Sequence, residues 1–325
     1  MSVPARRGRP AGDRELLVLI DLGSTAARFV LARVVPDTGY RVLYQQRVPT
    51  RLGDGPTGKL TRDAVTETAR AVHRFLQHLR TRDGLVPEGE SPRVLAVATS
   101  AVRDARNRNR LLGVLRRRDG VDVQVLSARQ EARLGVLAAL HSLPVRDGVV
   151  LDLGGASLQA SRVREGRIAS IASVRLGAVR LTRRFFAHDP PKPRELRALR
   201  AEIREQLAGA LPPARHGEVA VGLGGTVRAL ASIHLAGRRG TRTERHGLRL
   251  QQSDITAIRE RLEAVPRRKR RRIGGLKAER ADIILAGAMV IEEAMTFGGY
   301  LTLVVCTRGV RDGLLLRETF DGRLG

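Results

Sequence analysis

The sequence predicts an α/β protein built from two related domains, each with the element order βββαβαβα, with a cleft between them. The chain has 325 residues, of which 42% are hydrophobic, enough to build a large core. The predicted order of strands and helices occurs twice. Each copy opens with an apolar strand that ends in Asp-Leu-Gly, at Asp21 and at Asp152. Because a repeated pattern is more specific than any single motif, the duplication decides the fold prediction.

The first predicted domain covers residues 14–136. It opens with an apolar strand at 16–20. Strands at 28–35 and 40–48 follow, rich in β-branched residues and joined by a Pro-Asp-Thr-Gly turn. Apolar residues at helical spacing then predict a helix at 61–80, with Thr61 as its N-cap. The remaining elements are a strand at 94–99, a helix at 104–117, a strand at 121–126 and a helix at 129–141.

The second predicted domain covers residues 137–309 and repeats this order. A helix at 193–210 begins at Pro193, a residue suited to the first helical position. The other elements are strands at 149–151, 158–163, 168–174, 219–223 and 301–305, and helices at 226–235, 253–264 and 277–297. The segment 310–325 is expected to carry a terminal helix with room to pack back on the first domain. Residues 1–13 are expected to form a disordered basic tail.

The charge balance is strongly positive, with 59 basic and 33 acidic side chains and a formal net charge of +26. Such a balance indicates an anionic partner: a phosphate polymer, a nucleotide, nucleic acid or a membrane surface. A compositional preference for arginine is the alternative explanation. Aromatic residues make up only 3% of the chain, with no Trp, which argues against a base-stacking nucleic-acid module.

Other classes of protein are excluded by what the sequence lacks. No apolar run approaches the ~20 residues that a membrane span needs. A single cysteine, Cys306, excludes a disulfide framework and a thiolate metal site, and it favours a cytoplasmic location. A Gly-x-x-x-x-Gly-Lys-Ser/Thr run is absent, so a Walker-type NTPase is excluded as well.

Three glycine-rich turns are the candidate phosphate-binding elements. Glycine lets backbone N–H groups approach a phosphate without a Cβ in the way, and hydroxyl side chains add donors. An aspartate at the end of the preceding strand can hold Mg²⁺ beside the phosphates, so Asp21 and Asp152 are the candidate metal ligands. One such turn alone is most often an ordinary β-turn. Two turns at matching positions favour the interpretation that both bind one polyphosphate group. The predicted phosphate-binding residues are Gly23, Ser24 and Thr25, then Gly154, Gly155 and Ser157, and finally Gly224, Gly225 and Thr226.

Further blocks of sequence carry a family resemblance. Residues 98–107 read Ala-Thr-Ser-Ala-Val-Arg-Asp-Ala-Arg-Asn, and residues 126–134 read Leu-Ser-Ala-Arg-Gln-Glu-Ala-Arg-Leu. Together with the turns after Asp21 and Asp152, they resemble the exopolyphosphatase/guanosine-pentaphosphate phosphohydrolase (Ppx/GppA) family of the actin-like, ribonuclease-H-like ATPase superfamily. The later matching blocks are 224–226, 275–282 and 309–313. The resemblance therefore extends over nearly the whole chain, in a consistent order.

The resemblance implies two actin-like domains that hydrolyse a terminal phosphoanhydride of inorganic polyphosphate or of the guanosine polyphosphate pppGpp, with Mg²⁺ as cofactor. Glu131 matches the family's catalytic glutamate, expected to act as general base on the attacking water. Arg103 matches an arginine that contacts phosphate, and Asp152 matches the aspartate associated with Mg²⁺. General physical chemistry supports this role for Glu131, because a partly desolvated carboxylate near phosphates has its pKa raised towards the working pH.

The second turn departs from the family pattern. Where the family has Gly-Gly-Gly-Ser-Thr-Glu, this chain has Ala156, Leu158 and Gln159 at the third, fifth and sixth positions. A glutamine can orient a water but accepts its proton poorly, so Gln159 joins Glu131 and Asp152 as a predicted catalytic residue. The alternatives are a catalytically weakened regulator that binds polyphosphate or a guanosine polyphosphate and, less favoured, an actin-fold kinase.

The densest run of charge is predicted to be a docking patch for a polyanion, with a solvated helix end as the alternative. It consists of Arg267, Arg268, Lys269, Arg270, Arg271 and Arg272. The expected partners are inorganic polyphosphate or a guanosine polyphosphate, without a specific nucleic acid or a membrane, and a homodimer is left open. Between the two substrates, so strong a positive field favours the long polyanion.

Overall fold

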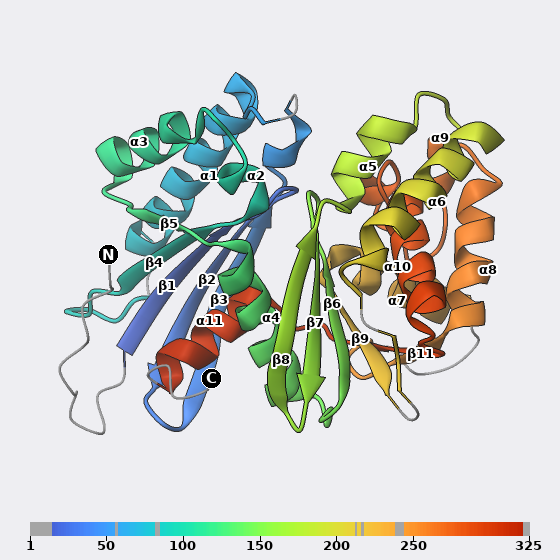
Figure 1. The fold of residues 1–325 in the computed structure, drawn as a ribbon. Helices are drawn as coiled ribbons and strands as arrows, with labels where there is room; N and C mark the ends of the chain where they lie inside the picture. Colours follow the sequence, from blue (N-terminus) through green and yellow to red (C-terminus); the bar gives the residue numbers. More distant parts are fainter. Residues whose placement is uncertain are drawn as a thin grey trace.

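The computed structural model describes residues 15–55, 58–81, 85–211, 213–215, 218–237 and 244–320, and shows two α/β halves side by side (Figure 1). The basic tail predicted at 1–13 and the last residues of the predicted 310–325 segment lie outside the described residues. Each half contains one mixed β-sheet, and the two sheets share one strand order. The duplication predicted from the sequence is therefore present in the fold.

The first half contains a five-stranded sheet of order β3-β2-β1-β4-β5. β1 (Glu15–Leu22) lies at its centre, antiparallel to β2 (Ala27–Val35) and parallel to β4 (Arg93–Ala98). Every residue of β1 after Glu15 is buried, because helices cover both faces of the sheet. The other elements are β3 (Gly39–Val48), η1 (Leu52–Asp54), α1 (Arg62–Thr81), α2 (Ser100–Arg103), α3 (Arg108–Asp119), β5 (Val123–Val125) and α4 (Ala128–Ser142).

The second half repeats this order as β8-β7-β6-β9-β11, with the short β10 added antiparallel to β11 at the edge. β6 (Gly148–Leu153) takes the place of β1, antiparallel to β7 (Leu158–Arg164) and parallel to β9 (Val219–Leu223). The other strands are β8 (Arg167–Val174), β10 (Arg249–Gln251) and β11 (Thr302–Val305). The helices are α5 (Ala178–Phe185), α6 (Pro193–Ala208), α7 (Gly224–Ala236), α8 (Gln252–Glu263), α9 (Arg267–Arg270), η2 (Ala278–Arg280), α10 (Ile284–Gly298) and α11 (Val310–Thr319).

The predicted start of the helix at 104–117 is wrong. The helix α3 begins at Arg108, and residues 104–107 form a turn that separates it from the short helix α2, which ends at Arg103. The physical reason is Asn107, whose side-chain amide accepts a hydrogen bond from the Leu60 N–H and donates one to the Leu60 carbonyl, both at 2.9 Å. These two bonds hold the chain at the break between α2 and α3.

The predicted start of the helix at 277–297 is wrong as well, because α10 begins only at Ile284, after the turn η2. In that turn Arg280 packs over Gly225, where an added Cβ would lie 1.9 Å from Arg280 Nη2. The helix is thus interrupted where the chain meets the glycine-rich turn before α7. The sequence analysis also misses the short elements α5 and β10.

The helices α4 and α11 pack against each other between the two sheets, in the middle of the molecule (Figure 1). α4 contacts β6, β7 and β8 of the second half, and α11 contacts β2 and β3 of the first. The backbones approach closely at Gly313, where an added Cβ would lie 2.1 Å from the Leu134 carbonyl oxygen. The last helix of each half therefore lies against the other half, and the pair joins the two sheets.

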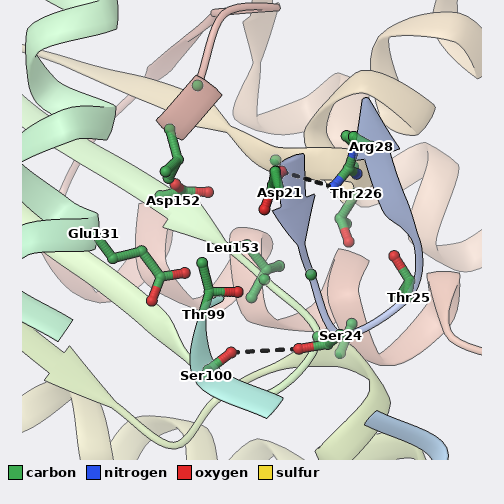
Figure 2. A pocket seen from close by; sticks show the side chains of 18 of the residues that line it. Asp21, Ser24, Thr25, Arg28, Thr99, Ser100, Glu131, Asp152, Leu153 and Thr226 are labelled. Carbon is green, nitrogen blue, oxygen red and sulfur yellow. Dashed lines mark hydrogen bonds and ion pairs between the residues drawn. The ribbon is translucent and has the colours of Figure 1, made fainter. Parts of the chain in front are cut away.

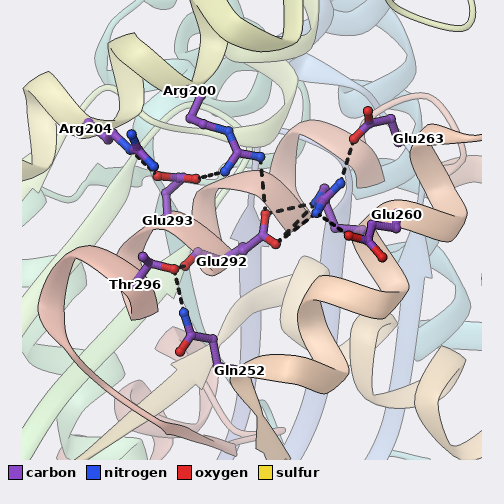
Figure 3. Close-up of polar contacts among 9 residues, drawn as sticks. Arg200, Arg204, Gln252, Glu260, Glu263, Glu292, Glu293 and Thr296 are labelled. Carbon is purple, nitrogen blue, oxygen red and sulfur yellow. Dashed lines mark hydrogen bonds and ion pairs between the residues drawn. The ribbon is translucent and has the colours of Figure 1, made fainter. Parts of the chain in front are cut away.

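The helix α10 runs through the interior of the second half and nearly all of its residues are buried. It carries two buried carboxylates, Glu292 and Glu293, which are 5% and 1% exposed. Glu293 binds Arg200 and Arg204 from α6 (Figure 3). Glu292 accepts a hydrogen bond from Arg259 Nε of α8 at 3.0 Å. Within the described residues, no helix combines the length and apolar character needed to cross a membrane.

Candidate active site

A cleft between the two halves is lined by the turns that follow β1, β6 and β9. Figure 2 shows the carboxylates of Asp21, Glu131 and Asp152 facing a shared space, with the hydroxyl side chains of Ser24 and Ser100 nearby. The lining is completed by Gly23, Thr25, Arg28, Thr99, Leu153, Gly154, Gly155, Ala178, Gly224, Gly225, Thr226, Arg228, Arg280, Ile283, Gly309, Val310, Arg311 and Asp312. The three glycine-rich turns predicted from the sequence therefore meet at one place.

The turns after β1 and β6 have the same length and the same internal hydrogen bond. Gly23 N–H donates to the Ala26 carbonyl at 3.2 Å, and Gly154 N–H donates to the Ser157 carbonyl at 3.0 Å. In each turn the strand-end aspartate is paired across the hairpin with the residue seven positions later. This partner is Arg28 for Asp21, and Gln159 for Asp152.

The two turns touch each other across the cleft. A Cβ added to Gly155 would lie 2.8 Å from the Cβ of Ser24, so only a glycine fits there without a shift. Ser24 Oγ also lies 3.3 Å from Ser100 Oγ, at the start of α2. The hydroxyl groups of Ser24 and Ser100 from the first half therefore lie beside the Gly155 turn of the second half.

The third turn leads from β9 into α7. Gly224 has a φ of +94°, and a Cβ there would lie 2.3 Å from the Leu153 carbonyl oxygen and 3.2 Å from Asp152 Oδ1. A side chain at this position would therefore collide with β6 and crowd the aspartate. The turn opens a helix of 13 residues, whose N-terminal N–H groups and dipole favour an anion in the cleft.

Glu131 lies in the first turn of α4. The N-terminus of α4 is fixed by a capping box, in which Ser127 and Gln130 bond to each other's backbone N–H groups. The Glu131 residue is 8% exposed, and its Oε2 accepts a hydrogen bond from Arg103 Nη1 at 2.9 Å. Burial raises the pKa of Glu131 to about 7, although Arg103 opposes this rise. A carboxylate with this pKa suits a general base that works near neutral pH.

The donor chemistry of Asp21 and Asp152 fits a Mg²⁺ ion. Burial raises the pKa of Asp152 to about 6, and the negative charge of Asp21 adds to this rise. If two carboxylates of the cleft bind the ion, phosphate oxygens and water can fill its remaining coordination positions, which is how proteins usually bind Mg²⁺. In the part of the chain that the structure describes, no group of three or more His, Cys, Asp or Glu side chains could hold a metal alone.

Four arginines also line the cleft, and among the described residues only one of them, Arg28, forms an ion pair with a carboxylate. Arg28, Arg228, Arg280 and Arg311 come from β2, α7, η2 and α11. Burial together with Arg28 lowers the pKa of Arg228 to about 10, and the same two causes lower the pKa of Arg280 to about 10. The Asp21 carboxylate lies 3.5 Å from Arg28 Nη1. Arginines that repel one another in a cleft form a site for a multiply charged anion.

The same four arginines also line a groove that continues out of the cleft. Three further basic side chains line it, Arg47, Arg245 and Lys277, against one carboxylate, Glu279. We call these seven basic residues together the arginine groove. Neither the cleft nor the groove has an aromatic side chain among its described lining residues.

Several predicted site residues do not line the cleft. Arg103 is not among the lining residues, but it donates hydrogen bonds to Glu131, which lines the cleft, and to the Leu126 carbonyl. Gln159 is 2% exposed and donates from Nε2 to Ser157 Oγ at 2.8 Å, so both residues lie behind the turn. The run from Arg267 to Arg272 belongs to α9 and the turn after it, outside the cleft.

The sequence analysis assigns no role to the four clustered arginines. One signal for Arg28 is present in the sequence, because a tight hairpin after Asp21 places Arg28 directly opposite it. No comparable signal marks Arg228, Arg280 or Arg311, since each comes from a different element and only the fold brings them together.

Comparisons with known proteins show the family of this chain. The sequence profile of the Ppx/GppA phosphatase family matches residues 30–320. The chain belongs to the Ppx/GppA phosphatase family. It is 34% identical over 317 residues to an uncharacterised protein of Streptomyces coelicolor, covering 94% of this chain and 90% of that protein. It is 30% identical over 316 residues to exopolyphosphatase 1 of Mycobacterium tuberculosis, covering 93% of this chain and 88% of that protein.

Among solved structures, the Ppx/GppA family member of Aquifex aeolicus superposes with a TM-score of 0.78 at 27% identity, covering 96% of this chain and 99% of that one. The predicted fold class, two actin-like α/β domains, is thereby confirmed. Within this Ppx/GppA protein, the cleft that holds Glu131 and Asp152 lies between the two related halves.

Proposed function

We propose that this Ppx/GppA protein is an exopolyphosphatase, a Mg²⁺-dependent hydrolase that releases the terminal phosphate of inorganic polyphosphate. The observation that carries the proposal is the position of the buried Glu131 in a cleft that leads directly into the arginine groove. The name of the mycobacterial relative, exopolyphosphatase 1, supports the same reaction. The single buried cysteine suits a reducing compartment, so we place the reaction in the cytoplasm.

Glu131 acts in this proposal as the general base. Its carboxylate takes a proton from a water molecule, and the water oxygen forms a bond to the terminal phosphorus. The bridging P–O bond breaks, and the shortened chain leaves with its new terminal oxygen. Arg103 holds Glu131 in place and favours its ionised form, because it donates a hydrogen bond to Oε2.

The terminal phosphates are held by N–H and hydroxyl donors of the paired turns, chiefly around Ser24 and Gly155. Asp21 and Asp152 would hold Mg²⁺ beside them. When bound, Mg²⁺ supplies charge neutralisation at the phosphate oxygens. The arginine groove then takes the following phosphates of the chain, because its guanidinium groups offer paired donors to phosphate oxygens.

The lining of the groove favours polyphosphate over pppGpp. A guanine base is usually held by stacking on an aromatic side chain, and the described lining of the cleft and groove provides none. A phosphate chain needs only the cations. We keep pppGpp as a second substrate of the same cleft, since its triphosphate end offers the same terminal phosphoanhydride.

The test is phosphate release from long-chain polyphosphate, tripolyphosphate, pppGpp and ATP, each with and without Mg²⁺. We expect release from both polyphosphates only with Mg²⁺, and slower release from pppGpp. The Glu131→Gln variant should lose about 10²–10⁴-fold in kcat while still binding polyphosphate. Glu90→Gln removes an exposed carboxylate that pairs with Arg33 and lines neither the cleft nor the arginine groove, so it should leave kcat unchanged. Absence of release from every substrate contradicts the proposal, and ATP-dependent transfer to a sugar acceptor would favour an actin-fold kinase.

A second candidate function, a regulator that binds polyphosphate without efficient turnover, is favoured by Gln159. This neutral side chain is paired across the hairpin with Asp152, where the family pattern has a glutamate. Against that candidate, Gln159 is bonded to Ser157 and does not line the cleft. We therefore expect Gln159→Glu to raise kcat by less than about tenfold. A gain far above this would favour the regulator.

A further inference from the structure

A second positively charged surface lies outside the cleft, in the segment that joins α8 to η2. It consists of five exposed side chains: Arg267, Arg268, Lys269, Arg271 and Arg272. We call these five residues the α9 cluster. Across the described part of the chain, none of the five forms an ion pair with a carboxylate. The charge of the cluster is therefore available to a partner.

The backbone that carries the α9 cluster is firmly held. The Asp189 carboxylate accepts from the Arg267 backbone N–H, at 2.8 Å to Oδ1 and 3.0 Å to Oδ2. Arg270, at the centre of the run, is 2% exposed, and its Nε donates to the Leu262 carbonyl at 2.7 Å. Its Nη2 has no hydrogen-bond partner, and the nearest carboxylate oxygen, on Asp189, is 3.9 Å from Nη1. This buried guanidinium adds positive charge directly beneath the cluster.

The segment that carries the cluster continues into the wall of the arginine groove. Gly275 and Lys277 both line the groove. Gly275 has a φ of +81°, and a Cβ there would lie 2.1 Å from the Ser232 carbonyl oxygen, so the chain is pressed against α7 at this point. Lys277 is five positions after Arg272, which limits the distance between their Cα atoms to about 18 Å. One extended anion can therefore reach both surfaces.

We propose that the α9 cluster is an accessory binding site for the distal part of a long inorganic polyphosphate chain whose terminal phosphates occupy the cleft and the arginine groove. This inference rests on the proposed exopolyphosphatase function. A linear polyanion without bases is held by charge alone, which is what five unpaired cations on a rigid segment offer. Holding the chain at a second point raises its local concentration at the cleft, so long chains bind more tightly than short ones.

Two other polyanions suit the α9 cluster less well. Stable binding to a membrane surface usually needs apolar side chains that insert into the bilayer. The large apolar side chains that are exposed in the described residues lie outside the cluster: Val42, Val94, Phe297 and Leu301. Single-stranded nucleic acid is usually bound with aromatic side chains that stack on bases, and the run from Arg267 to Arg272 contains none. Inorganic polyphosphate requires neither feature.

The test compares a triple variant with a matched control. The cluster variant carries Arg267→Gln, Arg268→Gln and Lys269→Gln. The control carries Arg110→Gln, Arg116→Gln and Arg117→Gln, three exposed residues of α3, which lies on the opposite side of the molecule from α9 (Figure 1). Both variants lose the same charge. Steady-state kinetics are measured for polyphosphate of several hundred phosphates and for tripolyphosphate.

We expect the cluster variant to raise KM for the long chain by about tenfold or more, with KM for tripolyphosphate and both kcat values unchanged. The control should change none of these constants. Equal effects in the two variants, or an unchanged KM for the long chain, would overturn the proposal. Failure of the proposed function is a separate result, because the wild-type protein would then release no phosphate from tripolyphosphate either.

Direct binding gives a second measurement that does not depend on turnover. Fluorescently labelled long-chain polyphosphate is titrated with Glu131→Gln protein, with and without the three cluster substitutions, and with duplex DNA as competitor. We expect the cluster substitutions to weaken polyphosphate binding about tenfold. If they instead abolish DNA binding and leave polyphosphate binding unchanged, the cluster is a nucleic-acid site and the proposal is wrong.

Discussion

Arg103 Nη1 lies 2.9 Å from Glu131 Oε2 and also 2.9 Å from the Leu126 carbonyl oxygen. A single guanidinium group thus joins the carboxylate of α4 to the backbone just before that helix. The family resemblance assigns Arg103 to phosphate, but in this structure its hydrogen-bond partners include the proposed general base. The position and the ionisation of Glu131 therefore both depend on Arg103.

The pH dependence of the reaction follows from this pair. Glu131 must be ionised to accept a proton, and its pKa is raised to about 7 by burial, so we expect kcat/KM to fall as the pH drops through about 7. Arg103 lowers this pKa, so Arg103→Gln should move the acidic limb to higher pH. The measurement is a pH profile of phosphate release, with Arg110→Gln on α3 as control. A limb that stays in place or moves to lower pH would argue against Glu131 as the base.

The clustered arginines predict opposite effects on stability and on binding. Burial and the neighbouring Arg28 lower the pKa of Arg280, so its charge is unfavourable in the empty cleft. We expect Arg280→Gln to raise the free energy of unfolding by about 0.5–2 kcal/mol and to raise KM for polyphosphate at least about tenfold. Urea denaturation and steady-state kinetics measure the two effects. Arg249→Gln, an exposed change on β10, should alter neither. A loss of stability in Arg280→Gln contradicts the expected repulsion.

The close contact between α11 and α4 predicts a cost for any side chain at Gly313. Its Cβ would lie 2.1 Å from the Leu134 carbonyl oxygen, a backbone atom that cannot move alone. We expect Gly313→Ala to lower the free energy of unfolding by about 1–3 kcal/mol, and to lower kcat because α4 also carries Glu131.

The matched control for Gly313 is Gly113→Ala in α3. The added Cβ there meets only the flexible side chain of Arg117, at 3.0 Å, so the change should be neutral or stabilising. Thermal denaturation and phosphate release are measured for both variants. Equal stability of the two variants would show that α4 and α11 can separate without cost.

The buried carboxylate Glu293 predicts an asymmetry between removing an acid and removing its partners. Glu293 is 1% exposed, whereas the side chains of Arg200 and Arg204 are 34% and 55% exposed. In the double variant Arg200→Ala, Arg204→Ala, a buried carboxylate is left without these two cations, at an expected cost of about 3–5 kcal/mol. Glu293→Gln frees two arginines that already reach water, so its cost should be clearly smaller. Urea denaturation measures the free energy of unfolding of both variants. A larger loss of stability in Glu293→Gln than in the double variant would contradict this account.

Much of the fold follows from local sequence. The Asp-Leu-Gly turns at Asp21 and Asp152 and the repeated order of strands and helices predict two matching α/β halves, because periodicity and turn chemistry are properties of neighbouring residues. Helix starts are less accurately predicted. Asn107 interrupts a helix through bonds to Leu60, a residue 47 positions away that no local pattern connects to it.

The sequence by itself determined the two halves, the glycine-rich turns and Glu131 as candidate base. Only the tertiary structure decided which of the 59 basic side chains meet at the cleft. Arg28, Arg228 and Arg311 are separated by long stretches of chain, and they converge only because two sheets and the α4–α11 pair fix the elements that carry them. The tertiary structure likewise shows that Gln159 donates a hydrogen bond to Ser157 and that Arg103 donates one to Glu131. Local patterns specify elements, whereas convergence of distant charges depends on packing between those elements.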